Sequence, residues 1–216
     1  SVTLQYGARK CAAEAPAIPA RSWMVYSVDQ EAVLGSKEPD LRLAPASITK
    51  LMTAIITVEN LALTNPVTIS AVADATPIGF IGQPDVRQGE EWIVRDLLAN
   101  ILVQSGNDAA VALAEAVAGS VENFVVMMNE KAAEFGMSDT TFINPNGLDT
   151  DEHLSTAQDL VAMGRAALDY EAVLAIARIK HISFTVAGRQ LEVDATNRDL
   201  GVFPGLFGLK TGDTAA

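Results

Sequence analysis

Residues 44–58 read Ala-Pro-Ala-Ser-Ile-Thr-Lys-Leu-Met-Thr-Ala-Ile-Ile-Thr-Val, a largely apolar segment that carries one serine and one lysine near its start. Pro45 is suited to the start of a helix, and we predict a helix from Ser47 to Leu61. Beyond Lys50, apolar residues occupy most of the circumference of that helix. This pattern is typical of a helix in the interior of a protein, so we expect it to be buried.

The same segment places two chemically useful side chains together. Ser47 and Lys50 are three residues apart, so they share one face of the first helical turn. Unpaired N–H groups and the positive end of the helix dipole favour negative charge at Ser47. Burial of Lys50 would lower its pKa and allow it to accept the Ser47 proton. Ser-x-x-Lys alone is common, however, and an N-terminal serine followed by an exposed lysine is the ordinary structural interpretation.

A second polar group lies between two strongly apolar helical segments, at Ser105-Gly106-Asn107. We expect Gly106 to permit a sharp turn that projects a hydroxyl and an amide together. The alternative is a helix-to-helix connector in which Asn107 or Asp108 caps the second helix.

A third group ends the apolar segment Leu206–Gly212, which reads as a strand that finishes in a cation, a hydroxyl and a glycine. Taken by itself, this pattern also fits a plain strand end.

The order of the expected elements indicates the fold class. Hairpins are predicted near both ends, and Gly119, Gly136 and a Ser155/Gln158 capping box mark the ends of helices between them. Strands, a block of helices and returning strands favour an α+β fold with a cleft between two lobes. The hairpins are 23–28 with 32–35 and 182–186 with 191–193, and the helices are 47–61, 94–104, 108–118, 120–135 and 155–168.

Composition excludes several classes of function. The 216 residues are 49% hydrophobic and 19% charged, enough for one large core or two modest ones. The net charge of −12 would repel nucleic acid. A single cysteine, Cys11, permits neither an internal disulfide nor a Cys-rich metal site. His153 and His181 fit no zinc or Ser-His-Asp pattern, so we expect structural or exposed histidines, no metal and no cofactor.

The three short motifs, in this order, resemble the set that defines penicillin-binding proteins and serine β-lactamases. Similarity to the low-molecular-mass D-alanyl-D-alanine carboxypeptidases extends from about Ile18 to Thr214. It rests on the segments 44–50, 104–109, 144–149 (Asn-Pro-Asn-Gly-Leu-Asp) and 196–198 (Thr-Asn-Arg). The resemblance implies a β-lactamase/D,D-peptidase-like fold, with an antiparallel sheet packed with helices, a mostly helical lobe, and an active site in the cleft between them.

The resemblance also implies domain boundaries. We expect a lead-in over residues 1–20 and a catalytic domain over 21–216, with the helical lobe at about 62–165. Relatives continue beyond the Lys-Thr-Gly motif with further strands and a helix, which would be missing here. We therefore expect a fragment, an incompletely represented chain, or a strand completed by a second chain. No apolar run long enough for a signal peptide or a membrane span occurs, so a signal was either removed or never present.

The family's roles transfer to matching positions. The resemblance implies that Ser47 attacks the D-Ala-D-Ala carbonyl to form an ester, with Lys50 as base. Ser105 and Lys210 would relay the proton to the departing amine, and the Asn107 amide would orient the substrate.

Substrate-binding roles follow in the same way. Lys210 and Thr211 would hold the terminal carboxylate, and the N–H groups of Ser47 and Asp213 would form the oxyanion hole. Gly212 would allow close approach, and Arg198 matches a position near the cleft, with a surface loop residue as the alternative. The carboxylate of Asp213 departs from the family pattern and should repel substrate unless it points away.

The implied partners are peptidoglycan stem peptides and β-lactams as covalent inhibitors, outside the cytoplasm. A β-lactamase would need a glutamate that activates water, and no convincing match lies between Gly136 and Ser155. A non-catalytic penicillin-binding or cell-wall-binding protein on the same scaffold stays a second alternative.

Overall fold

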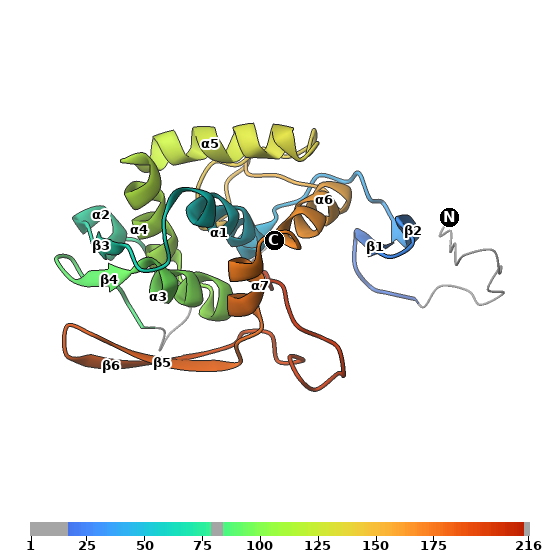
Figure 1. Ribbon diagram of the computed structural model, residues 1–216. Helices are drawn as coiled ribbons and strands as arrows, with labels where there is room; N and C mark the ends of the chain where they lie inside the picture. Colours follow the sequence, from blue (N-terminus) through green and yellow to red (C-terminus); the bar gives the residue numbers. More distant parts are fainter. Residues whose placement is uncertain (1–16, 79–83, 214–216) are drawn as a thin grey trace.

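The computed structural model describes residues 17–78 and 84–213 (Figure 1). Cys11 and most of the predicted lead-in at 1–20 lie outside the described residues. The elements are β1 (Trp23–Ser27), β2 (Ala32–Lys37), the 3₁₀ turn η1 (Ala46–Ile48), α1 (Thr49–Asn60), β3 (Pro66–Thr68), α2 (Ala71–Asp74), β4 (Glu91–Ile93), α3 (Val94–Ala99), the π-helix η2 (Asn100–Gln104), α4 (Asn107–Ala118), α5 (Val121–Glu134), α6 (Ala157–Ala167), α7 (Glu171–Ala177), β5 (His181–Val186) and β6 (Arg189–Asp194).

Helix α1 forms the centre of the molecule, as the sequence predicts. It packs against α4, α5, α6 and α7 (Figure 1), and residues 49–57 are all buried. Apolar side chains on most of its circumference remove it from water on every side. Lys50 is therefore carried into the interior on this helix.

The other predicted helices are present, with differences at their ends. The expected helix 94–104 is α3 followed by the π-helix η2, and π-helical turns are frequent at functional sites. Gly119 and Gly136 follow α4 and α5 with φ of 78° and 73°, which confirms both glycine end signals. The predicted capping box is wrong by one residue: the Thr156 side chain caps α6, whereas the Ser155 hydroxyl pairs with Thr140.

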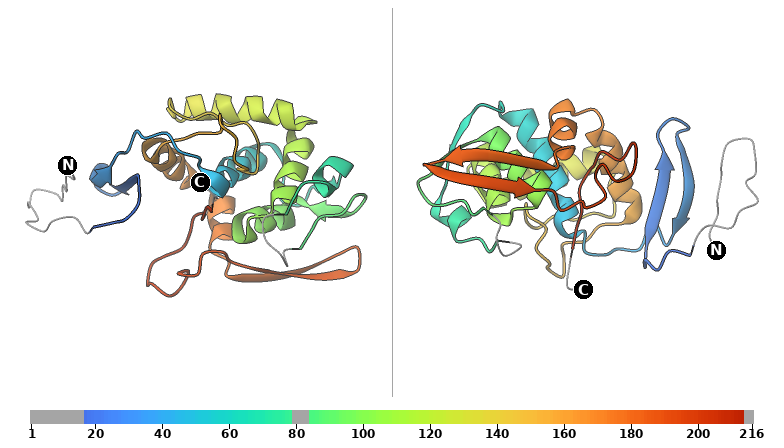
Figure 2. Two further views of the ribbon diagram at one scale, coloured as in Figure 1. Left: turned by 180° about the vertical axis from the view of Figure 1, so that it is seen from behind. Right: turned by 90° about the horizontal axis from the view of Figure 1, so that it is seen from below.

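The α+β class is confirmed, but the strands form three separate antiparallel ribbons within the described part of the chain. Both predicted hairpins are present, as β1–β2 and β5–β6. The pair β3–β4 and the helix α7 were not predicted, because three-residue strands and a seven-residue helix are too short to show a period. Figure 2 shows β5–β6 along one side of the helices and β1–β2 at one end of the molecule.

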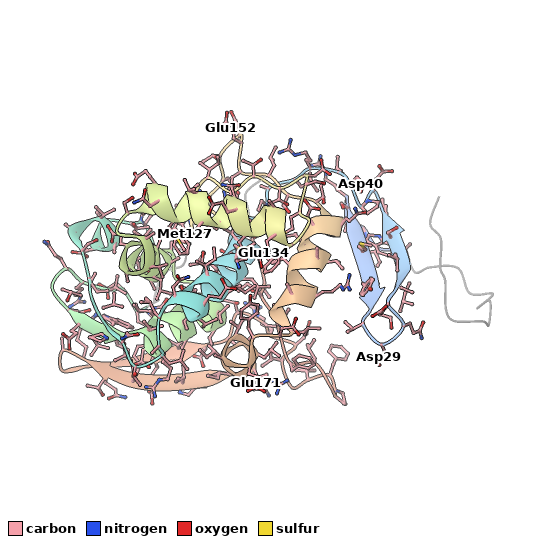
Figure 3. The ribbon with its side chains drawn as sticks, turned by 45° about the horizontal axis from the view of Figure 1, so that its top comes forward. Asp29, Asp40, Met127, Glu134, Glu152 and Glu171 are labelled. Atoms are coloured by element: carbon pink, nitrogen blue, oxygen red, sulfur yellow. The ribbon has the colours of Figure 1, made fainter. Side chains whose placement is uncertain are left out.

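The β1–β2 ribbon lies next to α6. Figure 3 shows Asp29 at the tip of this ribbon and Asp40 near its base. The guanidinium of Arg165 lies 4.6 Å from the centre of the Tyr26 ring and joins α6 to β1.

Hairpin β5–β6 is held against the helices by a ring pair and an ion network. Phe184 meets Trp92 edge-on at 5.3 Å between ring centres. Arg189 donates to Asp85 at 2.8 Å and to Glu90 at 2.7 Å. Residues 195–213 follow this anchored hairpin and carry the third motif toward α1.

The predicted strand at 206–212 is wrong, because no strand is assigned to that segment among the described residues. The Leu206 N–H donates to the Phe203 carbonyl in a turn, and the side chains of Lys210 and Thr211 make hydrogen bonds to other segments and to the Thr211 carbonyl, so these bonds form no strand ladder. The proposed domain boundaries and the second chain stay predictions.

Within residues 17–78 and 84–213, no single helix is long and apolar enough to cross a membrane, and only α4 and α5 together, bent by 85°, have that length and composition.

Candidate active site

The serine of the first motif lies on a strained turn at the start of α1. Ala46 has φ of +48°, which is costly for a residue with a side chain. Gly147 lies against this turn, and a Cβ there would overlap the Ala46 carbonyl oxygen. Because Gly147 also has φ of +82°, only glycine fits, and the close contact holds the half-buried Ser47 in place.

Lys50 is fully buried and donates to three oxygens. Its Nζ lies 2.9 Å from Ser47 Oγ and 2.7 Å from Asn107 Oδ1, and it also donates to the Asn146 carbonyl. Burial lowers the pKa of Lys50 well below 10.5, and the charge of Lys210 lowers it further, whereas Asp108 acts in the opposite direction.

The three oxygens around Lys50 Nζ are compatible with either protonation state of the amine. An ammonium group has three N–H donors, one for each oxygen. A neutral amine keeps two N–H donors for the two carbonyls, Asn107 and Asn146, and its lone pair then faces the Ser47 hydroxyl. Removal of one proton therefore leaves the lone pair directed at the serine.

The second motif turns differently from the prediction. Ser105 itself takes the left-handed conformation, with φ of 76°, whereas Gly106 has an ordinary φ of −60°. Glycine is needed for space instead, because a Cβ at Gly106 would overlap Asn100 Oδ1. Asn107 begins α4, and its Nδ2 donates to the Pro77 carbonyl at 3.1 Å.

The third motif meets the second. Lys210 Nζ donates to Ser105 Oγ at 3.0 Å and to the Thr211 carbonyl at 2.7 Å. Burial lowers the pKa of Lys210 to about 7. Gly212 lies against the turn before Ser47, since a Cβ there would be 3.3 Å from the Pro45 carbonyl oxygen.

The structure thus brings five predicted site residues into two adjoining networks. Ser47, Lys50 and Asn107 form one, and Ser105 and Lys210 form the other. The networks adjoin because Ser105 and Asn107 are two residues apart and Gly212, next to Thr211, lies against the turn before Ser47.

Two predicted site residues are not joined to these networks. Arg198 and Asp213 are exposed, and neither makes a hydrogen bond or ion pair with residues 17–78 or 84–213. In the same ranges, no group of three or more His, Cys, Asp or Glu side chains is arranged to hold a metal ion.

The sequence did not reveal how residues 143–155 support the site. His153 Nδ1 accepts the Ile143 N–H at 3.0 Å, so its protonated Nε2 donates to Thr49 Oγ1 at 2.8 Å. Burial lowers the pKa of His153 to about 4, which keeps it neutral. Thr53 donates to the Pro145 carbonyl at 2.6 Å. These bonds hold the Asn146 carbonyl over Lys50, and a backbone carbonyl leaves no signal in a side-chain pattern.

The sequence matches a known protein family. The profile of the D-alanyl-D-alanine carboxypeptidase family matches residues 9–216. D-alanyl-D-alanine carboxypeptidase DacF of Bacillus subtilis is 35% identical over 90% of this chain and 51% of its own length. The chain thus spans about half the length of that curated relative.

Solved structures agree with the sequence match. A D-alanyl-D-alanine carboxypeptidase from Mycobacterium tuberculosis superposes with a TM-score of 0.87 at 30% identity, over 94% of this chain and 76% of that one. A penicillin-binding protein from Listeria monocytogenes in its cefotaxime-bound form gives 0.77 at 32% identity, over 91% and 80%. Because the family profile covers nearly the whole chain and the fold agrees with it, this chain belongs to the D-alanyl-D-alanine carboxypeptidase family.

Proposed function

We propose that this chain is a serine D,D-carboxypeptidase that removes the terminal D-Ala from D-Ala-D-Ala stem peptides through an ester on Ser47. The observation that carries the proposal is the environment of Lys50, a buried amine with a lowered pKa that contacts Ser47 Oγ at 2.9 Å. A weak hydroxyl nucleophile needs such a base within hydrogen-bond distance.

Acylation begins with transfer of the Ser47 proton to neutral Lys50 while Oγ attacks the carbonyl carbon of the penultimate D-Ala. The developing oxyanion accepts from the backbone N–H groups of Ser47 and Asp213, and each such donor is typically worth about 2.7–4 kcal/mol. Among residues 17–78 and 84–213, the Asn107 Nδ2 donates to the Pro77 carbonyl alone, which leaves its second N–H for the substrate backbone.

Breakdown of the tetrahedral intermediate needs a proton on the departing amine. Ser105 donates its hydroxyl proton to that nitrogen and receives one from Lys210, which lies 3.0 Å away. Deacylation reverses the relay: Lys210, through Ser105, takes a proton from the attacking water, and Lys50 returns its proton to Ser47. Each lysine then regains its starting state.

The same lysine is suited to bind the substrate's carboxylate. With a pKa of about 7, Lys210 can carry a charge when substrate binds and release a proton during the reaction. Its ammonium and the Thr211 hydroxyl supply charge-assisted hydrogen bonds to a C-terminal carboxylate. Arg198 and Asp213 are exposed residues of the segment 195–213, which also carries Lys210 and Thr211. At this exposed position, Arg198 would add only long-range attraction for the carboxylate of the substrate.

Penicillins present a strained amide and a carboxylate, so we propose that they acylate Ser47 as well. The Listeria relative in its cefotaxime-bound form supports this. Because stem peptides occur in the cell wall, we propose that the protein acts outside the cytoplasm.

The test is covalent labelling of Ser47. After incubation with a fluorescent penicillin, intact-mass analysis should show one stable adduct, and D-Ala should be released from an acylated Lys-D-Ala-D-Ala tripeptide. Ser47→Ala should abolish both, whereas Ser183→Ala, on the exposed face of β5, should change neither. Absence of an adduct on the wild-type protein would refute the proposal, and rapid loss of the adduct would instead indicate a β-lactamase.

A further inference from the structure

Thr196 joins the segment after β6 to the helix that precedes Ser105. Its N–H donates to the Val103 carbonyl at 2.9 Å, and Val103 belongs to η2. Ser105 follows Val103 by two residues, and Thr211 follows Lys210 in the third motif. Thr196 is therefore fixed at the junction of two motifs.

The Thr196 hydroxyl has two acceptors within range. Thr211 Oγ1 lies at 2.7 Å, a normal length for a bond between hydroxyls, whereas the Val103 carbonyl lies at 3.4 Å and already accepts the Thr196 N–H. Either hydroxyl can donate in the 2.7 Å pair, so the direction of this bond depends on what accepts the Thr211 proton. When a carboxylate accepts the Thr211 proton, the Thr196 hydroxyl gives up its longer contact with Val103 and donates to Thr211.

This direction determines what Thr211 can do. If Thr196 donates, the Thr211 oxygen accepts, and the Thr211 proton is left for a ligand. In the opposite direction, the Thr211 proton would be used inside the protein, and its oxygen would present lone pairs that repel a carboxylate.

We infer that Thr196 is a positioning residue that aims the Thr211 hydroxyl proton at the free C-terminal carboxylate of the substrate. The chain from Thr196 through Thr211 to the carboxylate strengthens each bond by polarisation. Thr196 thereby sets the preference for a free acid over a neutral C-terminus. The inference rests on the proposed function, because it needs a carboxylate at Lys210 and Thr211.

The experiment compares two tripeptides, one ending in D-alanine and one in D-alaninamide. Thr196→Val removes the hydroxyl at nearly constant volume, and Thr196→Ser retains it. The valine variant should raise KM for the acid about tenfold, with kcat little changed, and leave kcat/KM for the amide within about twofold. The serine variant should keep the wild-type preference.

A double-mutant cycle provides a second readout. Thr211→Val should lower the preference for the acid, and adding Thr196→Val to it should change nothing further. An equal loss on both tripeptides, or additive effects in the cycle, would overturn the inference. If the valine variant does not fold, Thr196→Ala, which also lacks the hydroxyl, is measured in the same way.

Binding in the Ser47→Ala background separates this inference from the proposed function. Calorimetry on this variant measures Kd for the acid and for the amide without turnover. If the variant binds the acid selectively but the wild-type protein releases no D-Ala, only the proposed reaction is refuted. An acid-to-amide Kd ratio that is the same before and after Thr196→Val would refute only the role of Thr196. A protein that does not prefer the acid at all would refute both.

Discussion

Acid should detach the loop that holds the Asn146 carbonyl over Lys50, because that loop depends on a neutral His153. Protonation would place a hydrogen on Nδ1, which now accepts the Ile143 N–H at 3.0 Å. The imidazolium would also be buried, since His153 is 1% exposed.

The magnitude follows from the pKa of His153, which burial lowers from 6.5 to about 4. Between these values the unfolded chain binds a proton that the folded chain does not. The contribution of neutral His153 to the free energy of unfolding is therefore fully present above pH 6.5. It is lost as the pH falls to about 4, and the loss is about 3 kcal/mol at 1.36 kcal/mol per unit of pKa difference. That is a large part of a typical free energy of unfolding.

The assay is urea unfolding from pH 4 to pH 7, followed through the fluorescence of the buried Trp92. His153→Gln keeps an acceptor and a donor but does not titrate, so the wild-type protein should lose about 3 kcal/mol more than this variant over that range. His181→Gln is the matched control. His181 is exposed and its hydrogen bond to Asp194 raises its pKa, so it favours folding at low pH and cannot cause the loss.

Equal pH dependence in the wild-type and His153→Gln proteins would refute this reasoning. An NMR titration gives an independent check, because a His153 pKa near 6.5 in the folded protein would contradict burial as the cause.

Two further predictions concern the site. Gly147→Ala should lower the free energy of unfolding in urea by at least about 2 kcal/mol more than Gly89→Ala, and it should slow acylation. Both glycines have φ of +82°, but only Gly147 faces the Ala46 carbonyl. Equal losses of stability in the two variants would contradict the proposed contact. For Lys210, whose pKa is about 7, KM for the acid tripeptide should rise about tenfold per pH unit above 7. Lys210→Arg should flatten that rise and lower kcat, since arginine retains its charge but cannot pass a proton to Ser105; a wild-type KM that is constant from pH 6 to pH 9 would contradict the assignment.

The sequence alone determined the local elements with strong periods or end signals. The long helices, both hairpins, Gly119 and Gly136 were predictable because each depends on residues a few positions apart. The short β3, β4 and α7 were not, since their formation depends on packing. The expected strand at 206–212 failed for a related reason: a strand requires a partner, and its own sequence cannot supply one.

The sequence also determined the chemical groups of the candidate site, because the spacing of Ser47 and Lys50 and the order of the three motifs are local facts. Only the tertiary structure decided the burial, the pKa and the hydrogen-bond partners of those groups. The lowered pKa of Lys50 comes from burial by distant segments, and its third acceptor is a backbone carbonyl, at Asn146, 96 residues away. Charge, solvation and hydrogen-bond direction depend on neighbours in space, and the fold alone chooses those neighbours.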